Sequence, residues 1–325
     1  MFILVTGATG KVGRVLLDRL LSDPRWPDVR VRALCHNRAL PARNRIETVQ
    51  GSIADQMVVD RAMRDITHVF HMATVKEDPH TAMDVSVKGM FWMLEAFRQS
   101  PTAEQFILIG GDCVVGHITS VYDAPITELS PRRPYPGVYA LSKVLEEVML
   151  EQYYVQYGIN GCCLRAPWIM EKDDFRHVLA FGDQFGGPAW EELITAEQRQ
   201  AYLADNNVPL LVDAKGAPLR RNFIHVTDLV SAMLAALNNP AAVQQLFNIA
   251  MNDPLDYGVI AAHLQQTRGL ASIRIDTPFH SNWLDNAKAR QALGWQPRYD
   301  MIRLVDAAFD YQRAADDPRK IWYAG

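Results

Sequence analysis

The sequence predicts a doubly wound α/β fold, in which a parallel β-sheet carries helices on both of its faces. Short apolar runs alternate with segments of helical periodicity through the first half of the chain, and this alternation is typical of parallel sheets. A glycine-rich turn joins the first apolar run to the first helical segment. The apolar runs are continuous, which indicates strands buried on both faces. Right-handed crossovers between such strands produce the doubly wound form.

The predicted elements follow one another in a regular order. Strands are expected at residues 2–6, 29–34, 69–72, 106–109 and 161–164. Helices are expected at residues 11–21, 82–99 and 138–157, where the apolar positions have helical spacing. Residues 223–237 return to a strand followed by a helix.

The alternation stops after residue 166, which indicates a second domain. Residues 171–218 are rich in turn residues and aromatics, a composition that fits either a lid over a site or a surface insertion. The remainder of the chain is a smaller helical and loop region. We predict a large domain from residues 1–167 and about 220–250, and a smaller α/β domain from residues 168–219 and 251–325.

The composition argues against several classes of function. The formal net charge is −4 and there is no long basic run, so a nucleic-acid partner is not expected. No apolar run approaches the roughly 20 residues of a membrane span, and the apolar start is better explained as a strand than as a signal peptide. The cysteines, Cys35, Cys113, Cys162 and Cys163, show neither a paired framework nor a metal-binding spacing. We therefore expect a cytoplasmic protein with reduced thiols and no metal.

The turn after the first strand carries glycine at three positions, Gly7, Gly10 and Gly13. Gly7 permits a tight turn, Gly10 lets the backbone approach a pyrophosphate, and Gly13 allows the helix to pack closely on the strand. The N-terminus of the following helix would bind the phosphates through its N–H groups and its dipole. The large domain is therefore predicted to bind a dinucleotide.

The end of the second strand bears on the choice between NAD and NADP. An acidic residue about 20 positions after the glycine turn would bind the ribose diol of NAD, but residues 33–38 contain none. Arg38, together with His36, would instead suit the 2′-phosphate of NADP, because a guanidinium binds phosphate through two hydrogen bonds. The alternative for Arg38 is a solvated loop position. We expect NADP or NAD as the cofactor, with NADP favoured.

A tyrosine and a lysine stand four residues apart in the predicted helix 138–157. This spacing places Tyr139 and Lys143 on one face of the helix. A phenol is a poor acid or base at neutral pH, with a pKa near 10, but a neighbouring ammonium and a positively charged nicotinamide would lower that pKa. Tyr139 could then exchange the proton of a carbinol, and Lys143 could hold the nicotinamide ribose.

With these features the sequence resembles the extended short-chain dehydrogenase/reductase family, in its branch of sugar epimerases and dehydratases. The resemblance covers essentially the whole chain, and it rests on several motifs together. They are the glycine turn 6–13, the strand end 71–73, the helix segment 85–96, Tyr139 with Lys143, the segment 221–228, and the closing segments 247–250 and 288–295.

The resemblance implies a Rossmann-type cofactor domain, a C-terminal substrate domain and a cleft between them. It implies an oxidoreductase or epimerase that moves a hydride at a carbinol or carbonyl of a sugar or nucleotide sugar, and a homodimer built on helices 82–99 and 138–157. The expected cofactor contacts are Gly7, Thr9, Gly10, Lys11, Val12, Gly13, His36, Arg38, Ser52, Ile53, Met72, Ala73, Ile109, Tyr139, Lys143 and Pro167. The expected substrate contacts are Asp112, Arg165, Trp168 and Arg221.

The sequence departs from the family pattern at four positions. Gly111 stands where the family usually has a Ser or Thr that hydrogen-bonds the reacting oxygen. Asp112 falls where dehydratases place an acid, but Cys113 replaces the Glu that follows it, which argues against dehydration. Ser52 stands where an Asp commonly contacts adenine, and Trp168 stands where nucleotide-sugar enzymes often have an Asn.

The glycine at position 111 leaves two interpretations. Removing one donor from a developing charge raises the barrier by several kcal/mol. Either Thr74 or Asp112 replaces the missing hydroxyl, or the protein is a weak or specialised catalyst. We predict catalytic roles for Tyr139, Lys143, Asp112 and Thr74, and the alternative function is an NAD(P)-binding sensor or scaffold.

Other residues in the second half also have two interpretations. Arg165 could face the substrate or pair with a buried carboxylate. Arg221 is the kind of residue that the family uses to contact a diphosphate. The aromatic residues Trp168, Phe181, Phe185 and Trp190 could stack on a sugar or base, or pack in the core or a lid.

Overall fold

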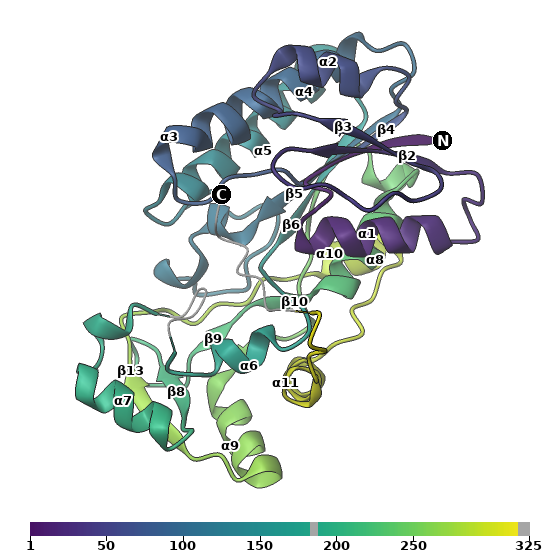
Figure 1. The fold of residues 1–325 in the computed structure, drawn as a ribbon. Helices are drawn as coiled ribbons and strands as arrows, with labels where there is room; N and C mark the ends of the chain where they lie inside the picture. The colour runs from purple at the N-terminus through teal and green to yellow at the C-terminus, as the bar shows by residue number, and fades with distance from the viewer. Residues whose placement is uncertain (183–187, 318–325) are drawn as a thin grey trace.

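The computed structural model describes residues 1–182 and 188–317, which form two packed parts (Figure 1). The larger part lies at the top of Figure 1 and is built on a twisted sheet between two layers of helices. The smaller part lies below it and contains shorter strands and several helices. The chain passes between the two parts more than once, as the green and yellow segments show (Figure 1).

A seven-stranded parallel sheet forms the centre of the larger part. Its strands are β1 (Phe2–Thr6), β2 (Arg30–Cys35), β3 (Ile46–Gln50), β4 (His68–His71), β5 (Gln105–Gly111), β6 (Gly161–Ala166) and β11 (Gln245–Asn248). Across the sheet they run in the order β11-β6-β5-β4-β1-β2-β3, and every neighbouring pair is parallel. The predicted doubly wound fold is confirmed. The direction of winding reverses between β1 and β4, and sheets of this kind bind ligands at the carboxyl ends of the strands beside such a point.

Helices cover both faces of this sheet. One face carries α1 (Lys11–Ser22), α8 (Val226–Ala236) and α10 (Ala287–Leu293), and the other carries α2 (Gln56–Met63), α4 (Gly89–Gln99) and α5 (Val138–Tyr157) (Figure 1). The predicted helix 82–99 is found as α4, preceded by the short helix α3 (Pro79–Ala82) and a π-helical turn (Met83–Lys88). On the inner face of α1, Leu16, Leu17 and Leu20 are buried against the strands, as expected of an amphipathic helix.

Three short strand pairs and four helices make up the smaller part. The pairs are β7 (Trp168–Met170) with β10 (Phe223–His225), β8 (Val208–Val212) with β13 (Ser272–Asp276), and β9 (Arg220–Arg221) with β12 (Leu255–Asp256). The helices are α6 (Asp174–Val178), α7 (Ala196–Ala204), α9 (Tyr257–Arg268) and α11 (Met301–Asp310). Single 3₁₀ turns occur at Asp112–Val115, His117–Thr119, Trp190–Glu192 and Pro240–Ala242.

Aromatic side chains fill the core of the smaller part. Phe175, Phe181, Trp190 and Phe223 are all buried there, and the ring centroids of Phe181 and Trp190 are 4.8 Å apart. Of the two interpretations of Phe181 and Trp190, core packing is the one that the structure supports. Phe185 lies outside the described residues.

The predicted division of the chain needs one correction. Residues 287–295, which the sequence analysis assigned to the smaller domain, pack on the larger part: Ala289, Leu293 and Trp295 belong to the apolar core under α1 and α8. The indole N–H of Trp295 donates to the Ser231 hydroxyl at 2.8 Å, which fixes this segment on α8. We retain the remaining boundaries as a proposal.

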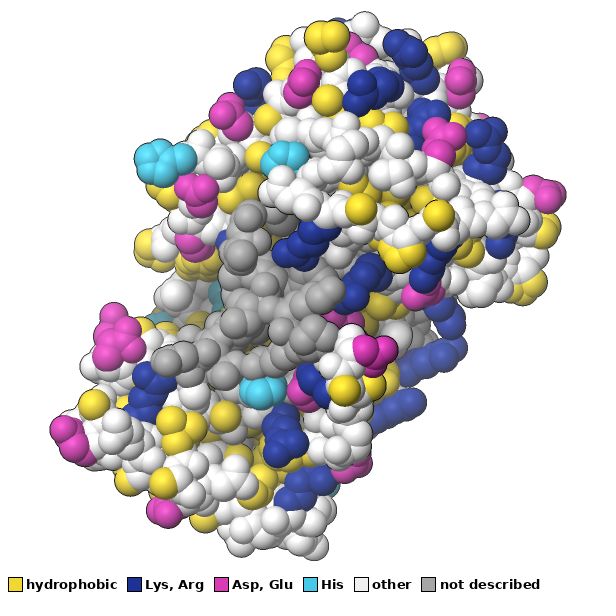
Figure 2. Space-filling model, in the orientation of Figure 1, with side chains coloured by type: hydrophobic (Ala, Val, Ile, Leu, Met, Phe, Trp, Pro, Cys, Tyr) yellow, Lys and Arg dark blue, Asp and Glu magenta, His cyan; other side chains and the backbone are white. Residues whose placement is uncertain are grey.

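Basic and acidic side chains are interspersed over both parts on the face drawn in Figure 2. Within residues 1–182 and 188–317, no helix combines the length and the apolar character that crossing a bilayer requires. The four cysteines are buried thiols.

Candidate active site

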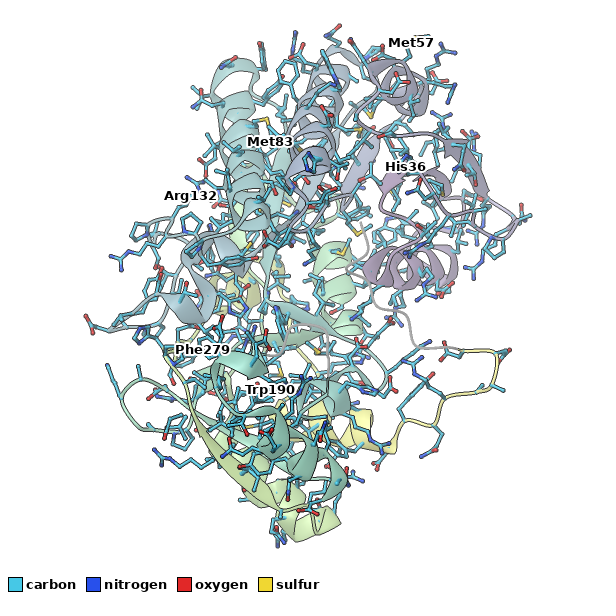
Figure 3. All side chains as sticks on the ribbon, turned by 60° about the vertical axis from the view of Figure 1, so that its left-hand side comes forward. His36, Met57, Met83, Arg132, Trp190 and Phe279 are labelled. Atoms are coloured by element: carbon cyan, nitrogen blue, oxygen red, sulfur yellow. The ribbon has the colours of Figure 1, made fainter. Side chains whose placement is uncertain are left out.

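A cavity of about 650 Å³ lies between the carboxyl ends of the central strands and the smaller part. Its walls come from the ends of β1, β4, β5 and β6 on one side and from residues such as Met170 and Phe279 on the other. Phe279 lies where the two parts meet, and Trp190 lies within the smaller part (Figure 3). The predicted site residues in its lining are Gly7, Gly10, Lys11, Val12, Gly13, Met72, Thr74, Ile109, Asp112, Tyr139, Lys143, Pro167, Trp168 and Arg221. Sequence segments far apart in the chain therefore meet at one cavity.

The glycine turn has the geometry that a dinucleotide pyrophosphate requires. Gly7 adopts a φ of +70°, which favours glycine. A Cβ at Gly13 would lie 2.4 Å from the Gly7 carbonyl oxygen, so only glycine lets α1 approach the turn this closely. Gly10 is the N-cap of α1, and because glycine has no side chain, it leaves the first N–H groups of the helix open to an anion. These residues fit the phosphates of NAD or NADP.

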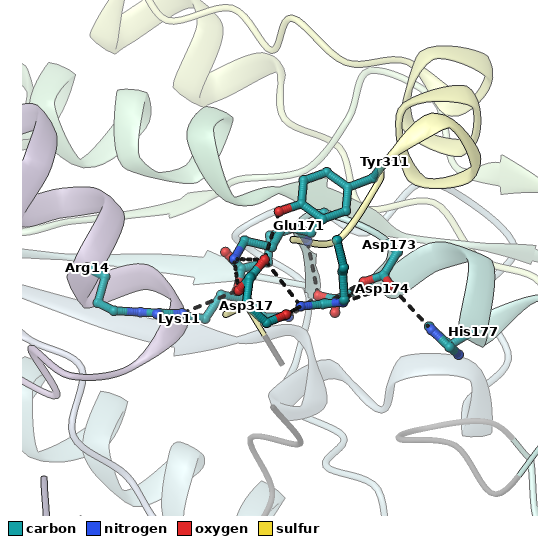
Figure 4. Close-up of polar contacts among 10 residues, drawn as sticks. Lys11, Arg14, Glu171, Asp173, Asp174, His177, Tyr311 and Asp317 are labelled. Atoms are coloured by element: carbon teal, nitrogen blue, oxygen red, sulfur yellow. Dashed lines mark hydrogen bonds and ion pairs between the residues drawn. The ribbon is translucent and has the colours of Figure 1, made fainter. Parts of the chain in front are cut away.

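Lys11 reaches from the glycine turn to the smaller part. Its ammonium donates to the Ile169 carbonyl oxygen at 3.0 Å and forms an ion pair with Asp174. Both side chains are largely buried. Figure 4 shows that this pair belongs to a wider polar network, in which Arg14 approaches Glu171 at 3.8 Å. The network links α1 to the beginning of α6 across the edge of the cavity.

The same network includes the last described residues of the chain. Lys172 donates to Asp317 at 2.7 Å, and Arg313 forms an ion pair with Asp173 (Figure 4). The Tyr311 hydroxyl also donates to Asp317, at 2.8 Å. The segment 311–317 is thereby fixed against Lys172 and Asp173, which lie between Glu171 and Asp174, the residues that pair with α1.

Tyr139 and Lys143 both project from the first turns of α5 into the cavity. The Lys143 ammonium donates to the Ile109 carbonyl oxygen at 3.0 Å and to Glu146 Oε2 at 2.7 Å. It lies 5.9 Å from the centroid of the Tyr139 ring. Both side chains therefore line the same cavity as the glycine turn.

The protein groups around the Tyr139 phenol oppose its ionisation. Burial raises the pKa of Tyr139 well above its usual value, and the nearby Cys113 and Glu146 act in the same direction. The ammonium of Lys143 is paired with Glu146. The lowering of this pKa expected from Lys143 together with a positively charged nicotinamide stays a prediction.

Several residues in the cavity lining were not predicted as site residues, among them Lys76, Glu77 and Tyr135. Lys76 lies over the ring of Tyr139, with 3.9 Å between its ammonium and the ring centroid. Glu77 accepts hydrogen bonds from the Tyr135 hydroxyl at 2.9 Å and from the backbone N–H of Tyr139 at 3.2 Å. Burial lowers the pKa of Lys76 to about 8. The signal that could have found Lys76 and Glu77 is their place just after β4, at the carboxyl edge of the sheet.

The end of β5 contributes residues with different roles. Burial raises the pKa of Asp112 to about 7, although the charges of Arg221, Arg165 and Lys76 oppose this effect. Burial also raises the pKa of the Cys113 thiol, so Cys113 is an unreactive filler at neutral pH. Gly111 has an extended backbone with a φ of −142°, and a Cβ there would lie 3.7 Å from the Tyr139 hydroxyl.

Arg221, Trp168 and His117 form the opposite end of the cavity. The Arg221 guanidinium lies 3.6 Å from the centroid of the Trp168 ring and donates to Nε2 of His117 at 3.1 Å. Burial and the charge of Arg221 hold the pKa of His117 well below its usual value, so this imidazole is neutral. Asp112 Oδ2 lies 3.7 Å from His117 Nε2. This end therefore joins a cation, an aromatic face and a carboxyl group.

The structure corrects the prediction for Arg165. Its side chain is only 1% exposed, and it donates through Nε and Nη2 to the two oxygens of Glu147, at 3.1 and 2.8 Å. It is absent from the described lining of the cavity. Arg165 is thus the partner of a buried carboxylate, the second of the two roles considered for it.

As far as the described residues show, the lining of the cavity does not include the other predicted contacts: Thr9, His36, Arg38, Ser52, Ile53 and Ala73. His36 and Arg38 are exposed beyond the end of β2, and Figure 3 shows His36 in the upper part, away from Phe279. Ile53 is buried against Gly89. These positions stay predictions. Among residues 1–182 and 188–317, no three His, Cys, Asp or Glu side chains lie close enough together to form a metal site.

Similarity to known proteins extends over most of this chain. The model of the NAD dependent epimerase/dehydratase family matches residues 3–250. The UDP-glucose 4-epimerase of Mycolicibacterium smegmatis is 27% identical over 337 residues, which cover 96% of this chain and 99% of that protein. The UDP-glucose 4-epimerase of Azospirillum brasilense is also 27% identical, over 97% of this chain and 92% of that protein.

Solved structures show the same fold. A short-chain dehydrogenase/reductase superfamily protein from Agrobacterium tumefaciens with bound NAD superposes with a TM-score of 0.77 at 22% identity, over 95% of this chain and 96% of that one. The UDP-glucuronic acid 4-epimerase from Bacillus cereus, in complex with NAD, superposes with a TM-score of 0.74 at 19% identity, over 96% of this chain and 98% of that one.

Proposed function

Since this chain belongs to the NAD dependent epimerase/dehydratase family, we propose that it is an epimerase that inverts a hydroxyl-bearing carbon in the hexose of a UDP-sugar. The observation that carries the proposal is the single cavity that joins the glycine turn, the Tyr139 phenol and the Arg221 guanidinium. The relatives from M. smegmatis and A. brasilense, which align over nearly the whole chain, are UDP-glucose 4-epimerases. Carbon 4 of the hexose is therefore the proposed reacting carbon.

A bound dinucleotide supplies the acceptor and donor of the hydride. Tyr139 would act as the phenolate, the form that a positively charged nicotinamide beside it favours. Its Oη would take the proton of the substrate hydroxyl while the hydride leaves the carbon, and would return that proton to the oxygen after the transient ketone has turned. Lys143, held by the Ile109 carbonyl oxygen and Glu146, keeps a positive charge at the cofactor side of the cavity. Thr74 and Asp112, predicted to act at the reacting oxygen, line the same cavity.

The far end of the cavity suits the nucleotide diphosphate. A guanidinium binds phosphate through charge-assisted hydrogen bonds, and the packing of Arg221 on Trp168 restricts the positions that its side chain can occupy. Because His117 is neutral and accepts from Arg221, it orients that side chain without adding a competing negative charge. We assign Arg221, Trp168 and Asp112 to the substrate.

NADP is the proposed cofactor, with NAD as the alternative. Residues 36–38 follow directly on β2 and include no carboxylate for a ribose diol, whereas Arg38 offers a guanidinium and His36 an imidazole that suit a 2′-phosphate. Titration calorimetry with each cofactor tests this choice. Tighter binding of NADP, lost in Arg38→Ala, is expected; equal or tighter binding of NAD would contradict the proposal.

The experiment for the activity follows the conversion between UDP-glucose and UDP-galactose by NMR, with absorbance at 340 nm recorded in parallel. An epimerase interconverts the two without accumulating reduced cofactor, whereas a dehydrogenase accumulates it. Tyr139→Phe is expected to abolish turnover and to retain cofactor affinity. Tight cofactor binding without turnover of any nucleotide sugar would instead support a sensor or scaffold.

We also propose a homodimer formed through α4 and α5. Met83 on the preceding π-helical turn (Figure 3), Phe91 on α4, and Leu141 and Val148 on α5 are large apolar side chains that are exposed in the single chain, and such exposure marks association surfaces. Light scattering after size exclusion tests this assignment. A dimer that becomes monomeric in Phe91→Glu is expected, and a monomeric wild-type protein would refute it.

A further inference from the structure

Glu146 forms a buried ion pair with Lys143, the lysine that stands four residues after Tyr139. Its Oε2 accepts from Lys143 Nζ at 2.7 Å, and the Ile109 carbonyl oxygen accepts from the same ammonium at 3.0 Å. The two side chains of the pair are 3% and 0% exposed. Glu146 is absent from the described lining of the cavity, whereas Lys143 belongs to it. The carboxyl group is therefore connected to the site through the lysine.

Stability does not explain a carboxyl group at this position. Glu146 Oε1 is buried without a hydrogen-bond partner among the described residues, and such an oxygen costs free energy in the folded state. A buried ion pair gives little net stability, because both charges lose their hydration. The next residue shows the contrast, since both oxygens of Glu147 accept from Arg165 and one also accepts from Arg132. Glu147 belongs to the scaffold, whereas the contact that distinguishes Glu146 is the one with Lys143.

The ion pair changes the electrostatic field at the phenol of Tyr139. A lone ammonium lowers the pKa of a nearby phenol, but an ion pair has a weaker field because its two charges partly cancel. Lys143 Nζ lies 5.9 Å from the centroid of the Tyr139 ring. Burial raises the pKa of Tyr139, and Glu146 acts in the same direction. A carboxylate beside Lys143 therefore opposes formation of the phenolate.

We infer that Glu146 is a positioning residue that holds Lys143 Nζ against β5 and withholds part of its charge from the Tyr139 phenol. The inference rests on the proposed function, in which this phenol exchanges the substrate proton. With Lys143 partly neutralised, the phenol gives up its proton chiefly when a second positive charge, that of an oxidised nicotinamide, lies beside it. Glu146 thus makes proton transfer at Tyr139 depend on the oxidation state of the cofactor.

Two substitutions separate the position of Lys143 from its charge. Glu146→Gln keeps an oxygen that can accept from Lys143 and removes the negative charge, whereas Glu146→Ala removes both. Glu151→Gln is the matched control, because it takes one carboxylate from the same helix at a half-exposed position, where Glu151 pairs with Arg132.

The first measurement is the midpoint of phenol ionisation. Tyr139 is replaced by a difluorinated tyrosine, whose fluorines lower the pKa of the phenol into an accessible range, and the phenol is titrated by fluorine NMR with and without the oxidised cofactor. Glu146→Gln should lower the midpoint by about one pH unit, and Glu151→Gln should leave it in place. An unchanged midpoint in Glu146→Gln would overturn the inference.

Other charged and titratable groups surround the phenol and the ion pair, and they stay the same in all of these variants. The phenol is faced by Lys76, Cys113, Tyr135 and Asp112, with Glu77 at its backbone N–H. Glu147 acts on Glu146, and His71 and Cys163 lie near Lys143.

A Lys143→Met background tests whether Glu146 acts through the lysine. Without the ammonium, the buried carboxyl group takes up a proton, so Glu146→Gln then exchanges one neutral group for another. Its effect on the phenol midpoint should be largely lost. A shift as large as the one seen with Lys143 present would show that Glu146 acts on the phenol directly, and would overturn the inference.

Cofactor affinity tests the positioning role. Glu146→Ala leaves the Lys143 ammonium with the Ile109 carbonyl oxygen as its remaining hydrogen-bond partner among the described residues. Calorimetry is expected to give a cofactor affinity about 3-fold to 10-fold lower in this variant than in Glu146→Gln, the effect of one hydrogen bond. Equal affinities would refute the positioning role.

The pH dependence of UDP-glucose turnover connects these measurements to the reaction. In Glu146→Gln the acid limb of the kcat profile should move to lower pH by about the same amount as the phenol midpoint, and a limb that stays in place would count against the inference. If no UDP-sugar is turned over, the proposed function fails, whereas the phenol midpoints still decide the role of Glu146.

Discussion

Glu77 accepts a hydrogen bond from the backbone N–H of Tyr139, with 3.2 Å between the two atoms. The other carboxylate oxygen of Glu77 accepts from the Tyr135 hydroxyl. The N-cap of α5 is Gly137, which has no side chain to cap the helix, so Glu77 fulfils that function from the loop after β4. A carboxylate at a helix N-terminus also interacts favourably with the helix dipole.

Glu77→Ala is therefore expected to lower the free energy of unfolding by about 1 kcal/mol, the usual effect of losing a cap. It should also lower kcat, because both Tyr139 and the neighbouring Lys76 lose a constraint on their positions. Denaturant unfolding and turnover of UDP-glucose measure the two effects. Glu77→Gln is the matched control, since its amide oxygen can still accept; an alanine variant as active and stable as the glutamine variant would contradict this role.

Two substitutions of Gly10 separate the effect of added charge on cofactor affinity from the effect of added bulk. Gly10→Asp should abolish cofactor binding, because its carboxylate would lie beside the phosphates at the start of α1. Gly10→Ala adds a Cβ that meets the Gly7 carbonyl oxygen at 3.1 Å and no charge, so a weaker loss is expected. Calorimetry with NAD and NADP gives both affinities, and cofactor affinity retained in the aspartate variant would remove the glycine turn from the cofactor site.

The ion pair between Lys11 and Asp174 holds an ammonium next to that same turn. Asp174→Asn is expected to strengthen cofactor binding by about 3-fold to 10-fold, since the charge of Lys11 is then less neutralised and more available to a phosphate; one charge-assisted hydrogen bond contributes about 1.5 kcal/mol or more. Affinity should also become more dependent on salt. Weaker binding in this variant would show that the pair supports the site instead.

Asp112 should make the stability of the protein depend on pH. Burial raises its pKa from 3.8 to about 7, against the charges of Arg221, Arg165 and Lys76. Between these values the folded state binds more protons than the unfolded state, so the free energy of unfolding falls as the pH rises from 4 to 7, by at most about 4 kcal/mol. The comparison is denaturant unfolding of the wild type and Asp112→Asn across this range. If the free energy of unfolding of the two proteins changed with pH in the same way, Asp112 would be excluded as the cause of the pH dependence.

The sequence predicted those parts of the site that depend on local pattern. The glycine turn and the Tyr139–Lys143 pair each lie within one turn or helix, so their spacing determines their geometry. The strand β3 was missed because Ile46–Gln50 has exposed positions and no continuous apolar run. The edge strand β11 is short and only half apolar, so its pattern was equally weak.

Contacts between distant segments explain the other errors. Arg165 pairs with Glu147 from the next element back, and no spacing in the sequence distinguishes that partner from a substrate. Burial, which raises the pKa of Tyr139 here, also depends on the fold and not on local spacing, whereas the pairing of Lys143 with Glu146 three residues later was visible in the sequence. Lys76 and Glu77 lie in an irregular loop, and only the fold brings them to Tyr139.

The last strand of the sheet in chain order, β11, is separated from β6 in the chain by much of the smaller part. β11 pairs with β6 through Gln245 and Cys162 and the residues that follow them, yet β7, α6, α7 and β8 all lie between these strands in the chain. During synthesis on the ribosome, the fully buried strand β6 therefore lies at the edge of the nascent sheet until residue 248 has emerged. Exposed strand edges invite wrong partners, so a translational pause between β6 and β11 would leave this chain at its most vulnerable to aggregation.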